Sequence, residues 1–336
     1  MNPILLASLM LSFFLSLAVI PLWIKKCRKV KLLWHDMNKP NKPGNVAASG
    51  GIVVILAFIF GILSYIAIRT FLFNDGVETL QIFSLLSVIL ILGLIGLTDD
   101  LLGWQHGGLS ARVRILLAFM ASIPLVVINA GTHTMNIPFF GNVGLGLFYP
   151  LVLIPLGIAG ASTTYNFLAG MNGLEAGQGM IILTFLSLVA YATGNAWLAM
   201  VGLCMVAALL GFYFYNKFPA KVFPGDIMTY SIGALIAGMA ILGNFEKIAV
   251  FVFIPYIIEV GLKLRGGLKK QSFGLPQKDG SLKMPYKKAY GLTHIALLLL
   301  SKVKRKVYEK DVVYLIFAFQ IFLCLLALVI FRGVLF

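Results

Sequence analysis

Four carboxylates stand beside apolar segments of this 336-residue chain, in three separate motifs. Asp99 and Asp100 follow the run LILGLIGLT, Glu175 lies in NFLAGMNGLEAGQG, and Asp226 ends KVFPGD. Two adjacent carboxylates near Arg and Lys side chains can hold a divalent cation, because hard cations such as Mg²⁺ prefer oxygen ligands. Taken alone, the pair also fits a marker of the membrane boundary or a cap of the following segment.

The second motif combines three amide side chains, one carboxylate and four glycines. Glycines let backbone N–H groups approach a ligand closely, and Asn and Gln supply neutral oxygen ligands and N–H donors. In the third motif Pro224 and Gly225 predict a turn, and Asp226 opens the next helix, where Asp is also a common N-cap. We predict that the motifs lie in three short loops, which a helix bundle can gather around one cleft.

The elements that must hold these loops are membrane-spanning helices. The chain is 60% hydrophobic and 12% charged, so the bilayer must be its main solvent. Because open backbone hydrogen bonds are costly in hydrocarbon, each span should be a helix. We predict an all-α polytopic membrane protein, a single domain over residues 1–336. About ten spans are expected near 2–24, 47–70, 80–98, 113–130, 146–168, 178–192, 196–215, 227–242, 248–264 and 312–333, with tight helical hairpins at 193–195 and 243–247.

The Lys and Arg residues assign one end of this bundle to the cytoplasm. Of the 27, only Arg69, Lys247 and Arg332 fall on the other side. The positive-inside rule therefore makes the three motifs cytoplasmic and puts both termini outside. The net charge of +15 belongs mostly to this face and suits anionic lipid headgroups, whereas no motif supports nucleic-acid binding.

The motifs together resemble those of the polyprenyl-phosphate N-acetylhexosamine-1-phosphate transferases. The resemblance is closest to the eukaryotic and archaeal UDP-GlcNAc:dolichyl-phosphate GlcNAc-1-phosphate transferase branch, and it covers nearly the whole chain. It is carried by the ten-span layout, LTDDLLGW at 97–104, NFLAGMNGLEAGQ at 166–178, VFPGD at 222–226 and GSLKMPYKKAYGLTHIALLLL at 280–300.

This resemblance implies transfer of GlcNAc-1-phosphate from UDP-GlcNAc to a polyprenyl or dolichyl phosphate. The products would be a lipid diphosphosugar and UMP, at the start of lipid-linked glycan assembly for N-glycosylation. Mg²⁺ is the implied cofactor, with Mn²⁺ as a substitute, and a homodimer is implied as well. The active site would be cytoplasmic, in the plasma membrane of an archaeon or in the endoplasmic reticulum of a eukaryote.

Site residues are implied by position. Asn166 and Asp226 would help bind Mg²⁺, and Asp99 and Asp100 would be the catalytic acidic pair. The substrate-binding set comprises Gly170 and Asn172 at the uracil, Phe223 against the base, Glu175 beside them, Arg114 near a position that is basic in the family, and Lys269 and Lys270 in place of the sugar-recognising segment.

The chain departs from the family pattern at several positions. Thr163 and Gly103 stand where the eukaryotic relatives carry Asn, and Ala48 lies near an expected acidic position. The histidine-rich motif of the bacterial relatives is absent. These departures bear on the identity of the sugar more than on the chemistry.

Two other classes of function share the feature of charge at membrane depth. A transporter or flippase for an anionic substrate would move its cargo without new covalent chemistry. A noncatalytic lipid-binding scaffold would keep its binding after loss of Asp99 and Asp226. The enzyme, by contrast, would release UMP in the presence of Mg²⁺.

Overall fold

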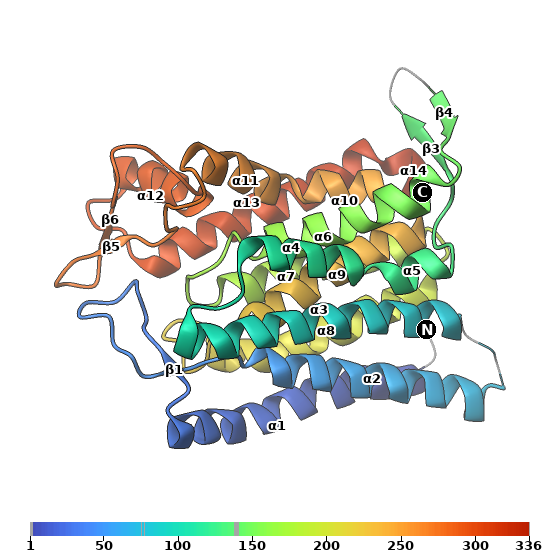
Figure 1. Cartoon of the computed structure of the whole chain (residues 1–336), viewed down its shortest axis with the longest axis horizontal. Coiled ribbons are helices and arrows are strands. Elements are labelled where there is room, and N and C mark those ends of the chain that lie inside the picture. Colours follow the sequence, from blue (N-terminus) through green and yellow to red (C-terminus); the bar gives the residue numbers. More distant parts are fainter. Residues whose placement is uncertain (1–2, 75, 77, 138–140, 336) are drawn as a thin grey trace.

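Long apolar helices dominate the computed structural model, which describes residues 3–74, 76, 78–137 and 141–335. Within these residues, seven helices are long and apolar enough to cross a membrane. They lie side by side in one bundle (Figure 1). The seven are α1 (Leu6–Val30), α2 (Gly51–Leu72), α3 (Thr79–His106), α7 (Leu174–Ala192), α8 (Ala196–Asn216), α9 (Asp226–Gly243) and α13 (Glu309–Ile330). The chain is a multi-pass integral membrane protein whose candidate spans are all helices.

Three of the predicted spans are interrupted rather than continuous. The span at 113–130 is divided into α4 (Ala111–Met120) and α5 (Ile123–Val127), and that at 248–264 into α10 (Glu246–Val252) and α11 (Ile254–Arg265). The span at 146–168 consists of a π-helical turn, η2 (Tyr149–Leu153), and α6 (Ile154–Tyr165). A proline lies in the first turn of each segment that follows a break. Proline lacks an N–H and favours the first turn of a helix, so it restarts each segment.

Short connections and small hairpins complete the fold. The tight turn between α7 and α8 and that between α9 and α10 agree with the prediction. The prediction of helices alone was incomplete, because three two-stranded antiparallel sheets lie outside the bundle. They are β1 (Leu33–Trp34) with β2 (Val46–Ala47), β3 (Thr134–Ile137) with β4 (Gly141–Gly144), and β5 (Leu275–Pro276) with β6 (Leu282–Lys283). Three short helices remain: η1 (Pro3–Leu5), α12 (Leu292–Val303) and α14 (Arg332–Leu335).

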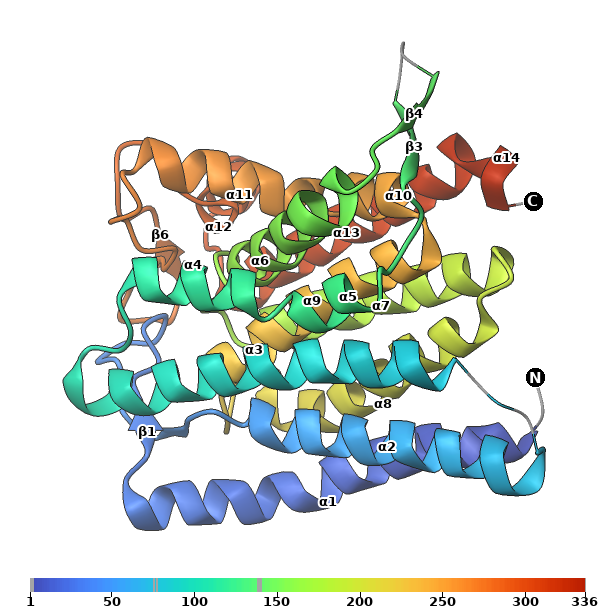
Figure 2. The same ribbon diagram turned by 45° about the vertical axis from the view of Figure 1, so that its right-hand side comes forward.

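The two ends of the bundle differ in what they carry. Both Figure 1 and Figure 2 show α14 and the β3–β4 hairpin at the end where α1 begins. The opposite end carries β1, the β5–β6 hairpin and α12. The chain therefore starts and finishes on one side, as the charge distribution predicts, and the basic segments 25–46 and 263–311 gather at the other.

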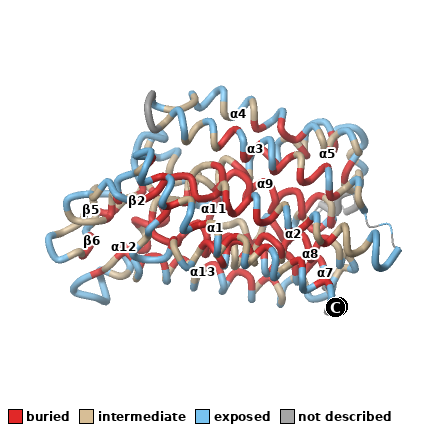
Figure 3. Tube along the Cα trace, turned by 90° about the horizontal axis from the view of Figure 1, so that it is seen from below, coloured by how far each residue is buried: buried red, intermediate tan, exposed pale blue. Residues whose placement is uncertain are grey.

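Helix α9 forms the centre of the bundle. Its candidate span is 89% buried, more than any of the other six. Figure 3 shows this buried centre, with α4 at the exposed margin. Gly96 of α3 permits close packing against α9, because a Cβ there would lie 2.5 Å from the carbonyl oxygen of Asp226. This contact places the end of α3 that bears Asp99 and Asp100 against the start of α9.

The substitution Gly96→Ala tests this packing. The added methyl group would meet backbone atoms of α9, which cannot move without shifting the helix. We expect a loss of about 1–3 kcal/mol of stability from overpacking, although Ala favours a helix more than Gly does. Thermal unfolding in detergent measures the change. Gly261→Ala in α11 is the control, since its Cβ would enter open space; equal melting temperatures for the two variants would contradict the close contact.

Candidate functional site

A cavity of about 670 Å³ lies at the end of the bundle that carries the basic segments. It is lined by the end of α3, the connection between α6 and α7, the start of α9, and parts of segments 34–49 and 271–273. Three motifs far apart in the sequence thus share one cavity. Seven of the predicted site residues line it: Asp99, Asp100, Asn166, Gly170, Glu175, Phe223 and Asp226.

The four carboxylates occupy helices, so their predicted placement in short loops was wrong. Asp99 and Asp100 lie within α3, because nothing in the following sequence stops the helix before Gly107, where φ is 88°. Glu175 lies in the first turn of α7, and Asp226 is the first residue of α9. The N-cap residue of α9 is Gly225, which has no side chain to make a capping hydrogen bond. The Asp226 carboxylate lies in the first turn, at the positive end of the α9 dipole.

One arginine joins two of these carboxylates. Nη1 of Arg114, from α4, lies 2.8 Å from Oδ2 of Asp99 and 3.6 Å from Oδ2 of Asp226. Asp99 also accepts a hydrogen bond from the backbone N–H of Leu109. Arg114 itself is not among the lining residues of the cavity. It acts from behind the wall, where it offsets the repulsion between two carboxylates.

Asp100 keeps one carboxylate oxygen without a protein partner. Its Oδ1 accepts the backbone N–H of Asp226 at 2.9 Å. Its Oδ2 is buried and has no hydrogen bond to any described residue. A buried acceptor without a partner is costly, and this one belongs to a residue that lines the cavity. The position suits an oxygen ligand for a bound cation.

The oxygen atoms on this wall fit a hard divalent cation that arrives with a phosphate-bearing ligand. Oδ1 of Asn166 accepts the Thr229 hydroxyl at 3.0 Å, which orients the amide near Asp226. Across the described residues, no three His, Cys, Asp or Glu side chains form a ready-made metal site. Mg²⁺ commonly takes only one or two carboxylates and completes its shell with water and substrate phosphates. Asp100, Asp226 and Asn166 supply such a partial set.

Gly170 and Phe273 approach one another closely in the lining of the cavity. Gly170 has φ of 100°, and its N–H donates to Oε1 of Glu175 at 2.7 Å. A Cβ on Gly170 would lie 2.5 Å from the ring of Phe273, so only glycine fits between this backbone and the ring. Phe223 and Phe273 both line the cavity. Aromatic faces beside exposed backbone suit a planar heterocycle.

His294 holds the backbone of Phe273 in place. The backbone N–H of Tyr290 donates to its Nδ1 at 3.2 Å, so Nε2 carries the proton and donates to the carbonyl of Phe273 at 3.2 Å. Burial lowers the pKa of His294, which keeps the imidazole neutral near pH 7. The neutral ring is the form that can make both hydrogen bonds.

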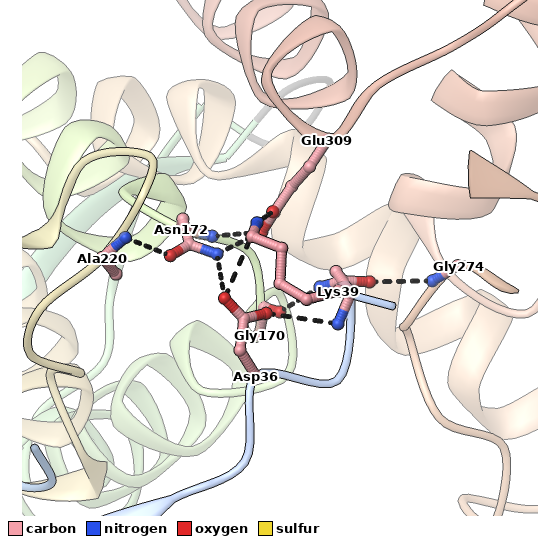
Figure 4. A network of polar contacts seen from close by, with 8 residues as sticks. Asp36, Lys39, Gly170, Asn172, Ala220, Gly274 and Glu309 are labelled. Atoms are coloured by element: carbon pink, nitrogen blue, oxygen red, sulfur yellow. Dashed lines mark hydrogen bonds and ion pairs between the residues drawn. The ribbon is translucent and has the colours of Figure 1, made fainter. Parts of the chain in front are cut away.

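Four of the predicted site residues lie outside the cavity lining: Arg114, Asn172, Lys269 and Lys270. Asn172 is buried, and its amide is used by protein groups: Oδ1 accepts from Ala220 N–H, and Nδ2 donates to Asp36 and Glu309 (Figure 4). Its predicted contact with uracil finds no support in this arrangement. Lys269 and Lys270 are exposed, and Nζ of Lys270 lies over the ring of Tyr286.

Sequence reasoning missed several residues around the cavity. Asp36, Asn38 and Glu309 are at most 4% exposed although all three are polar. The only signal in the sequence was the polar string HDMNK after the first span and a lone Glu before the last. Neither pattern shows that the two segments meet. Gln271, which the sequence placed with Lys269 and Lys270 in the segment that replaces the sugar-recognising one, does line the cavity.

Comparison with known proteins identifies several relatives. Residues 82–244 match the family described as Glycosyl transferase family 4. A candidate UDP-N-acetylglucosamine–dolichyl-phosphate N-acetylglucosaminephosphotransferase of Saccharolobus solfataricus is 35% identical over 294 residues, 87% of each chain. A protein of the same description from Sulfolobus acidocaldarius is 32% identical over 326 residues, 96% of this chain and 95% of the relative. A phospho-N-acetylmuramoyl-pentapeptide-transferase of Clostridium botulinum is 29% identical over 268 residues, 77% of this chain and 80% of the relative.

Replacement of Arg114, the cationic side chain that Asp99 and Asp226 share, tests the electrostatics of this acidic part of the cavity. Arg114→Gln would leave Asp99 and Asp226 facing one another without a counter-charge. Because the guanidinium is partly exposed, we expect a loss of about 1–3 kcal/mol. Adding Asp99→Asn should restore part of it, since one unpaired charge is removed. Thermal unfolding measures both, with the exposed Arg112→Gln on the same helix as control. An Arg114→Gln protein as stable as the control would show that the ion pairs contribute nothing.

Proposed function

We propose that this chain, which belongs to glycosyl transferase family 4, transfers GlcNAc-1-phosphate from UDP-GlcNAc to dolichyl or another polyprenyl phosphate. The products are a lipid diphospho-GlcNAc and UMP, and the reaction begins lipid-linked glycan assembly. The names of the two archaeal relatives describe this activity. The observation that carries the proposal is the single cavity in which Asp99, Asp100, Asn166 and Asp226 meet.

A second cavity supplies a place for the lipid. It is an apolar groove of about 610 Å³, lined by residues of η2, α6, α9, α10 and α11. Thr164 lines it at one end, two residues from Asn166 in the polar cavity. Tyr149 and Glu246 line it as well, at the other end of these helices. A polyprenyl chain in this groove would hold its phosphate beside the nucleotide-binding wall, which is the proximity that direct transfer requires.

The reaction needs orientation more than a strong base. An oxygen of the acceptor phosphate forms a bond to the β-phosphorus, the bond from that phosphorus to the bridging oxygen breaks, and UMP leaves with the electron pair. A phosphate monoester has a second pKa near 6, so much of the acceptor is already dianionic at neutral pH. Within the predicted acidic pair, both oxygens of Asp99 are engaged, Oδ2 by Arg114 and Oδ1 by the backbone N–H of Leu109. Asp100 keeps a free oxygen, with which it would hold the cation that draws the acceptor phosphate into place.

The remaining residues hold charges in place. Asp226, Asn166 and Asp100 would hold Mg²⁺ or Mn²⁺. When bound, this ion would neutralise the diphosphate and the charge that develops on UMP. Thr229 orients Asn166, and Arg114 orients Asp226. Phe223 and Phe273 would pack against the uracil, beside the backbone of Gly170, which Glu175 holds through a hydrogen bond.

The membrane arrangement follows from the same proposal. Each interrupted pair, α4 with α5, η2 with α6, and α10 with α11, serves as one span, so ten spans place both termini outside. Breaks inside a membrane are tolerated where neighbouring helices cover them or where they line a cavity, and the last two pairs line the lipid groove. The polar cavity then faces the cytoplasm, where nucleotide sugars are supplied. The homodimer stays a prediction.

A purified-enzyme assay tests the function. With UDP-GlcNAc, a polyprenyl phosphate and Mg²⁺, we expect release of UMP and a lipid product heavier by GlcNAc phosphate, identified by mass spectrometry. UDP-glucose should not be used. Asp100→Asn should lower turnover by about 100-fold or more, whereas Asp279→Asn, an exposed change on the same face, should not. Uptake of substrate into vesicles that contain the protein, without release of UMP, would indicate a transporter. Turnover of UDP-glucose alone would overturn the sugar assignment.

A glycine in the groove gives a separate test for the lipid. A Cβ on Gly160 meets no atom within 4 Å, so Gly160→Leu can fill the groove without disturbing the helix packing. We expect the KM for the lipid to rise about tenfold, the effect of losing about 1.4 kcal/mol of apolar contact. The KM for UDP-GlcNAc should not change. Gly261→Leu, on the exposed side of α11, is the matched control. Equal lipid KM values for the two variants would place the lipid elsewhere.

A further inference from the structure

A network of five polar side chains lies beside Gly170 in the lining of the cavity (Figure 4). Asp36, Asn38, Asn172 and Glu309 are almost fully buried, and the side chain of Lys39 is 18% exposed. None of the five lines the cavity. They come from the connection between α1 and α2, the connection between α6 and α7, and the start of α13. The network therefore joins three segments that lie far apart in the sequence.

Asn38 links two walls of the cavity. Its Nδ2 donates to the carbonyl of Gly170 at 2.7 Å, and its Oδ1 accepts the N–H of Gly274 at 3.1 Å. Gly170 and Phe273, the neighbour of Gly274, both line the cavity, and a Cβ on Gly170 would lie 2.5 Å from the Phe273 ring. One buried amide therefore bridges the two walls directly.

Glu309 fixes the backbone on the Gly170 side. Its Oε1 accepts both the backbone N–H and Nδ2 of Asn172, each at 2.7 Å. Nδ2 of Asn172 also donates to Asp36 at 3.1 Å. Because Asn172 is two residues from Gly170, the first residue of α13 determines where the base-binding backbone lies.

The charges in the network are unbalanced. Lys39 forms an ion pair with Glu309 and lies 3.6 Å from Oδ2 of Asp36, so one cation serves two carboxylates. Its Nζ also lies 3.8 Å from the centre of the Phe218 ring. Breaking a buried ion pair by removal of one partner is far more costly than neutralising both. Loss of Lys39 would leave two buried carboxylates to repel one another beside Asn172.

We propose that Asp36, Asn38, Lys39 and Glu309 are positioning residues for the nucleotide. From outside the cavity they set its width at Gly170 and Phe273, and so determine the affinity for a uridine nucleotide. This inference rests on the proposed function, and it adds that the start of α13 and the α1–α2 connection control base binding. The lipid groove is lined by η2, α6, α9, α10 and α11 and shares no residue with the network. Lipid binding is therefore independent of it.

Charge substitutions give a pattern that general destabilisation would not. Lys39→Gln leaves two buried carboxylates and should weaken UMP binding, and raise the KM for UDP-GlcNAc, by about tenfold or more. Glu309→Gln keeps an acceptor for Asn172 and leaves Asp36 paired with Lys39, so about a threefold loss is expected. The double variant should lie between the two, because the second substitution removes one of the repelling charges. The KM for the lipid should stay within about twofold in all three.

UMP binding to the purified full-length protein, measured by calorimetry, is the first readout, and the two KM values are the second. Lys306→Gln is the control, since it removes a lysine from an exposed ion pair on the same face. Unchanged UMP affinity in Lys39→Gln, equal losses for UMP and lipid, or a double variant weaker than Lys39→Gln would each overturn the inference. If Lys39→Gln does not fold, Glu309→Gln and the double variant must still weaken UMP binding more than the control does. Wild-type turnover of UDP-GlcNAc decides the proposed function separately.

Discussion

The contact between the backbones of α3 and α9 is the constraint on which the site depends. Carboxylates at the ends of two membrane helices can share a ligand only if the helices approach closely, and Gly96 permits an approach that any side chain would prevent. Asp100 then accepts the first N–H of α9 and stands beside Asp226. The acidic wall of the cavity, formed by Asp99, Asp100 and Asp226, is therefore a result of helix packing. The rest of the cavity is closed around it by loops that polar contacts hold.

The same charge arrangement occurs at the cavity and in the network beside it. Arg114 serves Asp99 and Asp226, and Lys39 serves Asp36 and Glu309, so each cation faces two carboxylates. A partly buried site with more negative than positive charge attracts a cation. On the acidic wall this is useful, because the unpartnered oxygen of Asp100 lies there. In the network the two carboxylates instead accept hydrogen bonds from the amide of Asn172.

Much of the architecture could be predicted from sequence because the bilayer directly constrains where hydrophobic runs and basic loops can lie. The seven continuous helices, the tight hairpins and the gathering of three motifs all follow from such local patterns. The breaks at Pro155 and Pro255 were visible in the sequence but were outweighed by uninterrupted hydrophobicity. The partners of Asn172 could not be predicted, since Asp36 and Glu309 are separated from it by 136 and 137 residues. Only tertiary packing reveals that their charges are buried together.

The open side of the apolar groove has a consequence for kinetics. Leu156, Val250 and Ile257 line the groove and are each more than half exposed, and in the proposed ten-span arrangement they face the bilayer. A lipid can therefore enter sideways by diffusion within the membrane, without passing through water. The acceptor concentration that the protein senses is then a mole fraction in two dimensions. Diluting the membrane with inert lipid at constant bulk concentration slows encounter, while the soluble donor is unaffected.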